Sequence, residues 1–141
     1  MKKLSILSLL ALLILGSCKK DTPTSATCTY NTASVIGTYK TTSFLYKADA
    51  ATPEVDLFPS YPDCEKDDLL TFNSNGTYTV SEGATSCNPT NADSGTWSVS
   101  GNNMIVDSTT AEIQNFSCAG FKVKLTDAVT GEITTVSLAK Q

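Results

Sequence analysis

The chain contains no histidine and no arginine, so all ten of its basic residues are lysines. General acid–base catalysis near neutral pH most often uses histidine, and phosphate groups are most often held by arginine or by glycine-rich loops. Nucleic-acid binding needs a basic face, whereas this chain has 14 acidic residues and a net charge of −4. We therefore expect neither an enzyme nor a nucleic-acid-binding protein, and we expect no cofactor.

Long apolar runs are equally scarce. One is present, at residues 4–15, and it is too short to span a bilayer comfortably as a helix. Two lysines precede it and the small residues Gly16 and Ser17 follow it, which is the order of regions in an export signal peptide. We therefore predict a signal peptide at residues 1–17.

The residue after this segment is a cysteine, and residues 15–18 (LGSC) resemble the bacterial lipobox. In a lipobox the cysteine receives a diacylglycerol thioether before cleavage on its N-terminal side. We predict that Cys18 is lipidated and also carries an acyl chain such as palmitate, because stable anchoring takes more than one chain. The alternative is an ordinary secretory signal followed by an incidental cysteine.

Four further cysteines follow, at positions 28, 64, 87 and 118, and an exported chain meets an oxidising compartment. Four cysteines allow three pairings. We favour Cys64–Cys87 together with Cys28–Cys118, because the first pair flanks a predicted hairpin. Zinc is the rival use of cysteine, but the chain has no C-x-x-C and no histidine, so we expect no metal site.

Removal of residues 1–17 leaves 124 residues with a net charge of −6, which is enough for one domain. Residues 18–34 are small, polar and rich in threonine and serine, which predicts a flexible tether. From residue 35 to residue 141, short β-branched and aromatic runs alternate with glycine, asparagine, aspartate and proline. We therefore expect a single β domain at 35–141.

Eight segments of this domain have the composition of strands, and no segment shows a helical repeat. The alternation is cleanest at residues 121–125, where three apolar residues share one face and two lysines the other. Tight turns such as Asn73–Gly76 join several of them. Eight short strands without crossover helices predict an all-β, antiparallel up-and-down barrel, since closure removes exposed edges, with a two-sheet β-sandwich as the alternative. The strands are expected at 35–46, 67–73, 76–82, 93–99, 103–107, 110–117, 120–126 and 132–139.

The densest charge cluster comprises Asp63, Glu65, Asp67 and Asp68, with Asp56 upstream. Calcium takes several carboxylate oxygens, and a loop constrained by a disulfide is able to present them. A pair of carboxylates is also the machinery of glycoside hydrolysis. The spacing matches no EF-hand loop and nothing suggests a cleft, so we interpret the cluster as solvated charge.

Three short motifs together resemble a known family. They are Gly37-Thr38-Tyr39, the Cys64–Asp68 segment (CEKDD) and Gly95-Thr96-Trp97. The order is similar to that of the lipocalin-like domains in small lipoproteins of Gram-negative bacteria, where a G-x-W, a C-x-x-D-D and a further G-x-W recur. The resemblance covers residues 35–139, and the chain departs from the pattern at Tyr39, where tryptophan is commoner.

The resemblance implies an eight-stranded barrel, which encloses about the volume of one small ligand. Our first hypothesis is therefore an envelope lipoprotein whose barrel binds a small apolar or amphipathic molecule. Alternation along the strands selects the side chains expected to line the ligand site: Phe72, Tyr78, Val80, Trp97, Val99, Phe121, Val123 and Leu125.

The second hypothesis is a protein-interaction or inhibitor module whose barrel is filled by side chains. Its contact surface would be the loop at residues 48–63, where Leu57, Phe58 and Tyr61 stand beside prolines. In either case we expect a monomer that is anchored through its lipid to the outer membrane. The sequence leaves both the periplasmic face and the cell surface open as locations.

Overall fold

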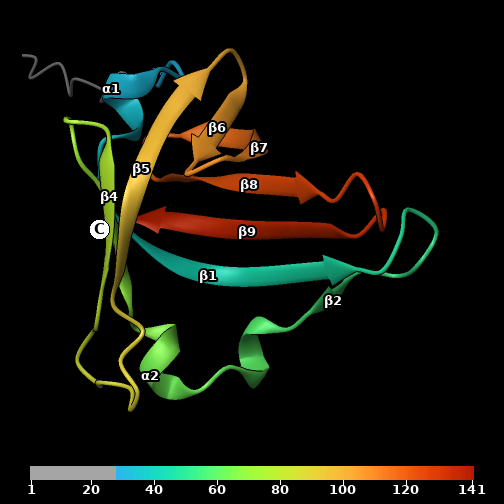
Figure 1. Cartoon of the computed structure of the whole chain (residues 1–141), viewed down its shortest axis with the longest axis horizontal. Coiled ribbons are helices and arrows are strands. Elements are labelled where there is room, and N and C mark those ends of the chain that lie inside the picture. Colours follow the sequence, from blue (N-terminus) through green and yellow to red (C-terminus); the bar gives the residue numbers. More distant parts are fainter. Residues whose placement is uncertain (1–27) are drawn as a thin grey trace, which may run out of the picture.

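A closed antiparallel barrel forms the body of the protein in the computed structural model, which describes residues 28–141 (Figure 1). The predicted signal peptide, Cys18 and the first part of the predicted tether lie outside these residues. The elements in chain order are α1 (Thr32–Val35), β1 (Gly37–Lys47), β2 (Val55–Asp56), η1 (Phe58–Ser60), α2 (Asp63–Lys66), β3 (Leu69–Phe72), β4 (Thr77–Ser81), β5 (Asp93–Ser100), β6 (Asn103–Val106), β7 (Thr109–Ser117), β8 (Gly120–Thr126) and β9 (Ile133–Lys140).

Eight of the nine strands make the barrel. From β3 to β9 each strand pairs antiparallel with the next, β3 pairs with the first half of β1, and β9 pairs along β1 to close the ring. The ninth strand, β2, is a two-residue segment that pairs with the far end of β1. This arrangement confirms the predicted eight-stranded up-and-down barrel and excludes the β-sandwich.

The turns follow the local chemistry of their residues. Gly76 has φ +82° and Gly101 has φ +59°, a left-handed conformation that glycine adopts without steric cost. Asp107, between β6 and β7, has φ +46° as a non-glycine residue, and its carboxylate accepts a hydrogen bond from the backbone N–H of Thr96 at 2.8 Å. The eight expected strands are all present because such turns fix where each one ends.

The start of the domain differs from the prediction. The first strand was expected from residue 35, but Thr32–Val35 forms a helical turn, α1, and β1 begins at Gly37. Asn31 and Ser34 form a reciprocal capping box, which satisfies the free N–H groups at the start of this turn. Residues 28–34 of the predicted tether are therefore part of the folded domain.

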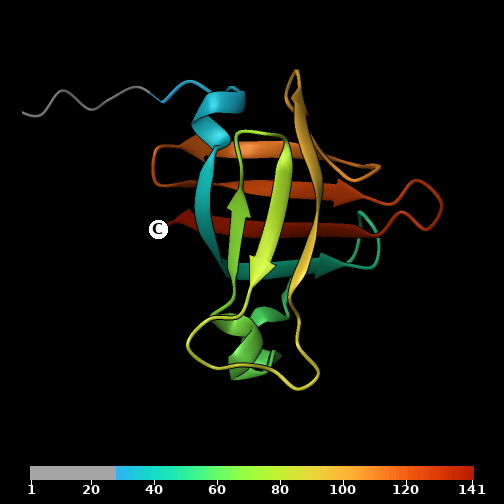
Figure 2. The ribbon, with the colours of Figure 1, turned by 60° about the vertical axis from the view of Figure 1, so that its left-hand side comes forward.

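Aromatic side chains fill the half of the barrel beneath α1. The ring of Tyr39 lies 5.1 Å from that of Phe121 and 5.8 Å from that of Phe72, and Phe72 lies 5.1 Å from Trp97, all between ring centroids. The Tyr39 hydroxyl donates to the carbonyl of Val35 at 2.8 Å, and this bond fixes the helical turn α1 over the end of the barrel. This end of the barrel is closed, while α2 and η1 lie at the opposite end (Figure 2).

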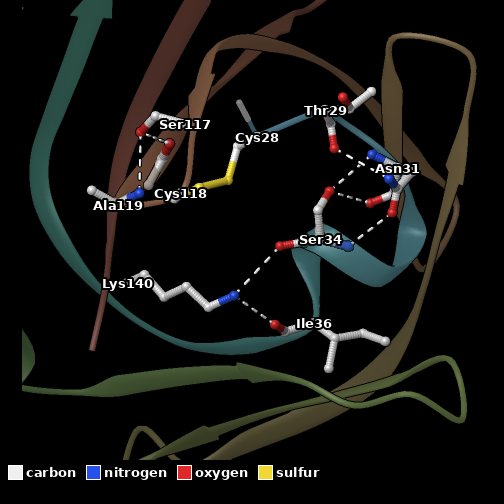
Figure 3. Close-up of a disulfide and its surroundings, with 10 residues drawn as sticks. Cys28, Thr29, Asn31, Ser34, Ile36, Ser117, Cys118, Ala119 and Lys140 are labelled. Carbon is white, nitrogen blue, oxygen red and sulfur yellow. Dashed lines mark hydrogen bonds between the residues drawn. A yellow bond between two sulfur atoms is a disulfide. The ribbon is translucent and has the colours of Figure 1, made fainter. Parts of the chain in front are cut away.

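Both predicted disulfides are present, so the pairing of Cys28 with Cys118 and of Cys64 with Cys87 is confirmed. The first joins the start of the described chain to the β7–β8 turn, close to Lys140 (Figure 3). The Nζ atom of Lys140 donates to the backbone carbonyls of Ile36 at 2.9 Å and Ser34 at 3.4 Å. These contacts fasten the incoming chain to the closed end. None of the helices in residues 28–141 is both long and apolar enough to cross a membrane.

Candidate functional site

A partly open pocket of about 270 Å³ lies at the end of the barrel opposite α1. It forms where β1 separates from the short strand β3 and the gap is covered by the segments that carry η1 and α2. This volume is comparable to roughly nine water molecules and lies just below the usual range for ligand pockets, which begins at about 300 Å³. The lining side chains are Thr41, Phe44, Phe58, Tyr61, Glu65, Asp68, Leu70, Val80, Asn91 and Val136.

A β-bulge determines which side chains β1 presents to the pocket. Thr41 pairs with Leu138 and Phe44 pairs with Val136, so the register of β1 against β9 shifts between Thr41 and Ser43. The extra residue changes the inward face from odd to even numbers along β1. Thr41 and Phe44 therefore both border the pocket, which strict alternation would not allow.

Three aromatic rings form one side of the pocket. The centroid of the Tyr61 ring lies 5.5 Å from that of Phe44 and 6.0 Å from that of Phe58. Asp56 holds this group in place, because its Oδ1 atom accepts from the backbone N–H of Phe44 at 3.2 Å and of Phe58 at 3.0 Å. The loop at residues 48–63 thus directs two of its aromatic side chains toward the barrel.

Two acidic side chains also line the pocket. They are Glu65, on α2, and Asp68, just before β3. Burial, followed by the nearby Glu82 carboxylate, raises the pKa of Asp68, while the backbone N–H of Gly83 acts in the other direction. Burial and the Glu65 carboxylate likewise raise the pKa of Tyr61. Both shifts have the same physical cause, since the charged form of each group is poorly solvated where it is partly buried.

Two carboxylates outside the pocket fix the β4–β5 connection, Glu82 by bonds within it and Asp67 by a bond that ties it to the end of α2. Glu82 accepts from the backbone N–H groups of Cys87 at 2.7 Å and Asn91 at 2.6 Å and from the Thr90 hydroxyl, and these bonds lower its pKa. Asp67 accepts from the backbone N–H of Thr85 at 2.9 Å. With the Cys64–Cys87 disulfide, they fix the position of the segment that carries Glu65 and Asp68.

Of the eight side chains that alternation selected as a ligand lining, seven belong to the core cluster, pack against it or border the pocket. Phe72, Tyr78, Trp97 and Phe121 are buried in the core cluster. Val99 and Val123 are partly buried against that cluster, and Leu125 is half-buried farther along β8. Of the eight, Val80 borders the pocket. Alternation thus predicted which side chains point inward. It did not predict which of them pack in the core and which border the pocket.

The acidic residues considered as a calcium site do not converge on one point, and each makes different contacts. Asp56 and Asp67 accept backbone hydrogen bonds, Asp63 pairs with Lys66 at 3.2 Å, and Glu65 and Asp68 face the pocket. Over residues 28–141, no three metal-ligating side chains lie close enough together to hold an ion.

The structure adds lining residues that sequence reasoning did not select, chiefly Thr41, Phe44, Leu70, Asn91 and Val136. Leu70 pairs with Val80 and Val136 pairs with Val123. Residues that pair directly across two strands point to the same face, so the alternation of the strands could have identified Leu70 and Val136 as inward-facing. Nothing in the local sequence around Asn91 marks it, because only the folding of the β4–β5 connection brings it to the pocket.

The family model described as a lipocalin-like domain matches residues 35–128. This range covers two thirds of the chain and includes strands β1 to β8, with most of the core cluster and most of the pocket lining. A comparison with curated proteins finds no match, and a comparison with solved structures finds none either.

Proposed function

The chain belongs to the lipocalin-like domain family, and on this premise we propose that it is a non-enzymatic binding protein of the bacterial cell envelope. It takes one small apolar or amphipathic molecule into the pocket between β1, β3 and α2. A lipid on Cys18 holds it to the outer membrane.

The pocket is the observation that carries this proposal. Its lining combines aromatic and aliphatic side chains with a few polar groups, which is the usual composition of a site that recognises a small molecule. The rest of the barrel interior is packed. Binding is therefore expected at one end of the barrel, and the ligand is expected to be small.

The anchor rests on the sequence of residues 1–18. The described chain starts at the α1 end of the barrel, which is opposite the pocket (Figures 1 and 2). The segment that would carry the lipid therefore joins the domain at the closed end, away from the pocket. This geometry is compatible with a membrane-bound protein that exchanges its ligand with solution.

Contacts of the loop at residues 48–63 favour ligand binding over the alternative of a protein-interaction surface. Phe58 and Tyr61, two of the apolar side chains that such a surface would use, line the pocket instead. Val55 is half exposed on the short edge strand β2. A single exposed valine is ordinary on a protein surface and does not indicate a partner.

Filling the pocket tests the proposal. We expect wild-type protein to bind N-phenylnaphthylamine, an uncharged probe whose fluorescence rises in apolar surroundings. Val80→Trp places an indole in the pocket and should weaken this binding by about tenfold or more, because the probe and the indole compete for the same apolar volume. Thr79→Trp, on the exposed face of the same strand, is the matched control and should bind like the wild type. Equal affinity in both variants would place the probe elsewhere and refute the pocket as the ligand site.

A further inference from the structure

The charges around the pocket have one sign. Glu65 and Asp68 are its two ionisable carboxyl groups, and none of its lining residues is basic. The lysine nearest to them in the sequence, Lys66, pairs with Asp63 at the surface. Glu82 adds a further negative charge that acts on Asp68. A concave site with acidic walls and no compensating cation focuses a negative potential on whatever enters it.

Asp68 has unused hydrogen-bonding capacity. Its Oδ1 atom is buried and has no hydrogen-bond partner within the part of the chain that the structure describes. Leaving a carboxylate oxygen buried without a donor is unfavourable. This oxygen is shielded from the pocket, so a ligand ammonium group beside Asp68 would stabilise the carboxylate through its positive charge and, after a small rotation of the side chain, through a charge-assisted hydrogen bond.

The aromatic side of the pocket suits the same kind of ligand. Phe44, Phe58 and Tyr61 form a connected set of rings that borders the pocket together with the two carboxylates. Aromatic faces attract ammonium groups within about 6 Å of the ring centre. They also supply apolar surface for the hydrocarbon part of an amphipathic molecule. A carboxylate ligand, by contrast, would meet two like charges and no positively charged side chain in this lining.

We infer that the pocket selects small amphipathic amines, whose ammonium group lies near Asp68 and Glu65 and whose apolar part packs against Phe44, Leu70 and Val80. Fatty acids and other anions are excluded by the acidic wall. This inference rests on the proposed function and names the ligand class for the same site.

Three probes with the same phenyl ring and similar length test the selection: phenethylamine, phenethyl alcohol and hydrocinnamate, measured with the folded domain by isothermal calorimetry or NMR titration at neutral pH. We expect the amine to bind about tenfold more tightly than the alcohol, which corresponds to one charge-assisted hydrogen bond. Hydrocinnamate is expected to bind more weakly than the alcohol, because it brings a like charge to the acidic wall.

The variants separate the pocket charge from the overall charge. Asp68→Asn should lower the preference for amine over alcohol about tenfold while the affinity for the alcohol stays within about twofold. Asp63→Asn removes the same unit of charge at a side chain that is 93% exposed and does not line the pocket, so it should leave the preference unchanged. If Asp68→Asn does not fold, as judged by circular dichroism, Glu65→Gln provides the same comparison.

The outcomes for the inference and for the proposed function differ. If the alcohol and N-phenylnaphthylamine bind but the amine shows no advantage, the selection of amines is refuted and the pocket remains a binding site for neutral molecules. The same conclusion follows if Asp63→Asn and Asp68→Asn lower the preference equally. If neither the neutral probes nor the amine binds, the proposed function fails and the inference fails with it.

Discussion

Tyr78 illustrates how single residues connect distant parts of this barrel. Its ring is buried in the core, and its hydroxyl lies 3.0 Å from Oδ2 of Asp107 and 3.3 Å from Oδ2 of Asp93. Asp107 also accepts from the backbone N–H of Thr96. The Tyr78 hydroxyl therefore joins β4 to the β6–β7 turn and to the start of β5.

We expect Tyr78→Phe to lower the free energy of unfolding by about 1 kcal/mol, the usual net contribution of one hydrogen bond. Chemical denaturation measures this difference. Tyr46→Phe is the control, since the Tyr46 hydroxyl donates to Glu132 in an exposed pair, and its loss should be smaller. Losses of equal size would show that burial of the Tyr78 hydroxyl bond has no energetic consequence.

Tyr78 also predicts a pH dependence. Burial, followed by the hydrogen bond to Asp107 and the negative charges of Asp107 and Asp93, raises the pKa of Tyr78 from 10.0 to about 12. Because the folded state holds the proton more tightly, the contribution of neutral Tyr78 to stability is complete below pH 10 and is lost as the pH rises toward about 12. The stability difference between wild type and Tyr78→Phe should therefore shrink over this range. A difference that stays constant to pH 12 would contradict the raised pKa.

At the scale of elements, β8 tests the alternation on which the barrel depends. Val123 packs against the core and pairs with Val136, whereas Lys124 pairs with Glu112 and Thr135 on the outer face. Val123→Asp places a carboxylate in the interior of a chain without arginine or histidine, so it should cost several kcal/mol, or about half of a typical domain's stability.

Lys124→Thr is the matched control, and it should change stability by no more than about 0.5 kcal/mol. Threonine is preferable to aspartate there because an aspartate would face Glu112 directly. Thermal unfolding of both variants measures the difference. Similar losses would mean that β8 does not alternate between interior and solvent.

Most of the barrel was predictable from the sequence because its signals are local. Glycine and asparagine mark the turns, and alternation marks the inward face of strands such as Phe121–Leu125. The disulfide pairing followed from the hairpin that Cys64 and Cys87 flank. The exception was the start of the domain, where Val35 and Ile36 are β-branched but a capping box at Asn31 nucleates a helical turn instead.

The pocket was less predictable because it depends on distances that no short segment encodes. Alternation indicates that Phe72 and Leu70 both point inward, but not that Phe72 meets other rings while Leu70 borders a pocket. The bulge after Thr41 reverses the face of β1 without any glycine or proline to signal it. Tyr61 and Asn91 reach the pocket from connections whose path only the folded chain defines.

For the whole molecule, the two ends of the barrel differ in how tightly their interior is packed. The α1 end is packed with aromatic rings and fastened by the Cys28–Cys118 disulfide and Lys140 (Figure 3). The α2 end holds the pocket and is fastened by the Cys64–Cys87 disulfide. The packed core thus lies mainly at the end where the chain enters, and the proposed ligand site lies at the other.

The membrane anchor makes a separate prediction. Cys18→Ser removes the thiol proposed to take the lipid, so expression of the full-length variant in a Gram-negative host should abolish palmitate labelling and leave unprocessed precursor or a soluble product. The wild type should be labelled and membrane-bound. Palmitate labelling of the Cys18→Ser variant would exclude this cysteine as the lipidation site.

The most direct test of ligand binding at the open end is an NMR titration of the folded domain with N-phenylnaphthylamine. We predict saturable amide shifts centred on Thr41, Phe44, Val80 and Val136, which line the pocket, and little change at Tyr39, Trp97 and Met104 in the closed half. The absence of saturable shifts, or shifts centred on the closed half, would contradict the proposal that this barrel binds a ligand between β1, β3 and α2.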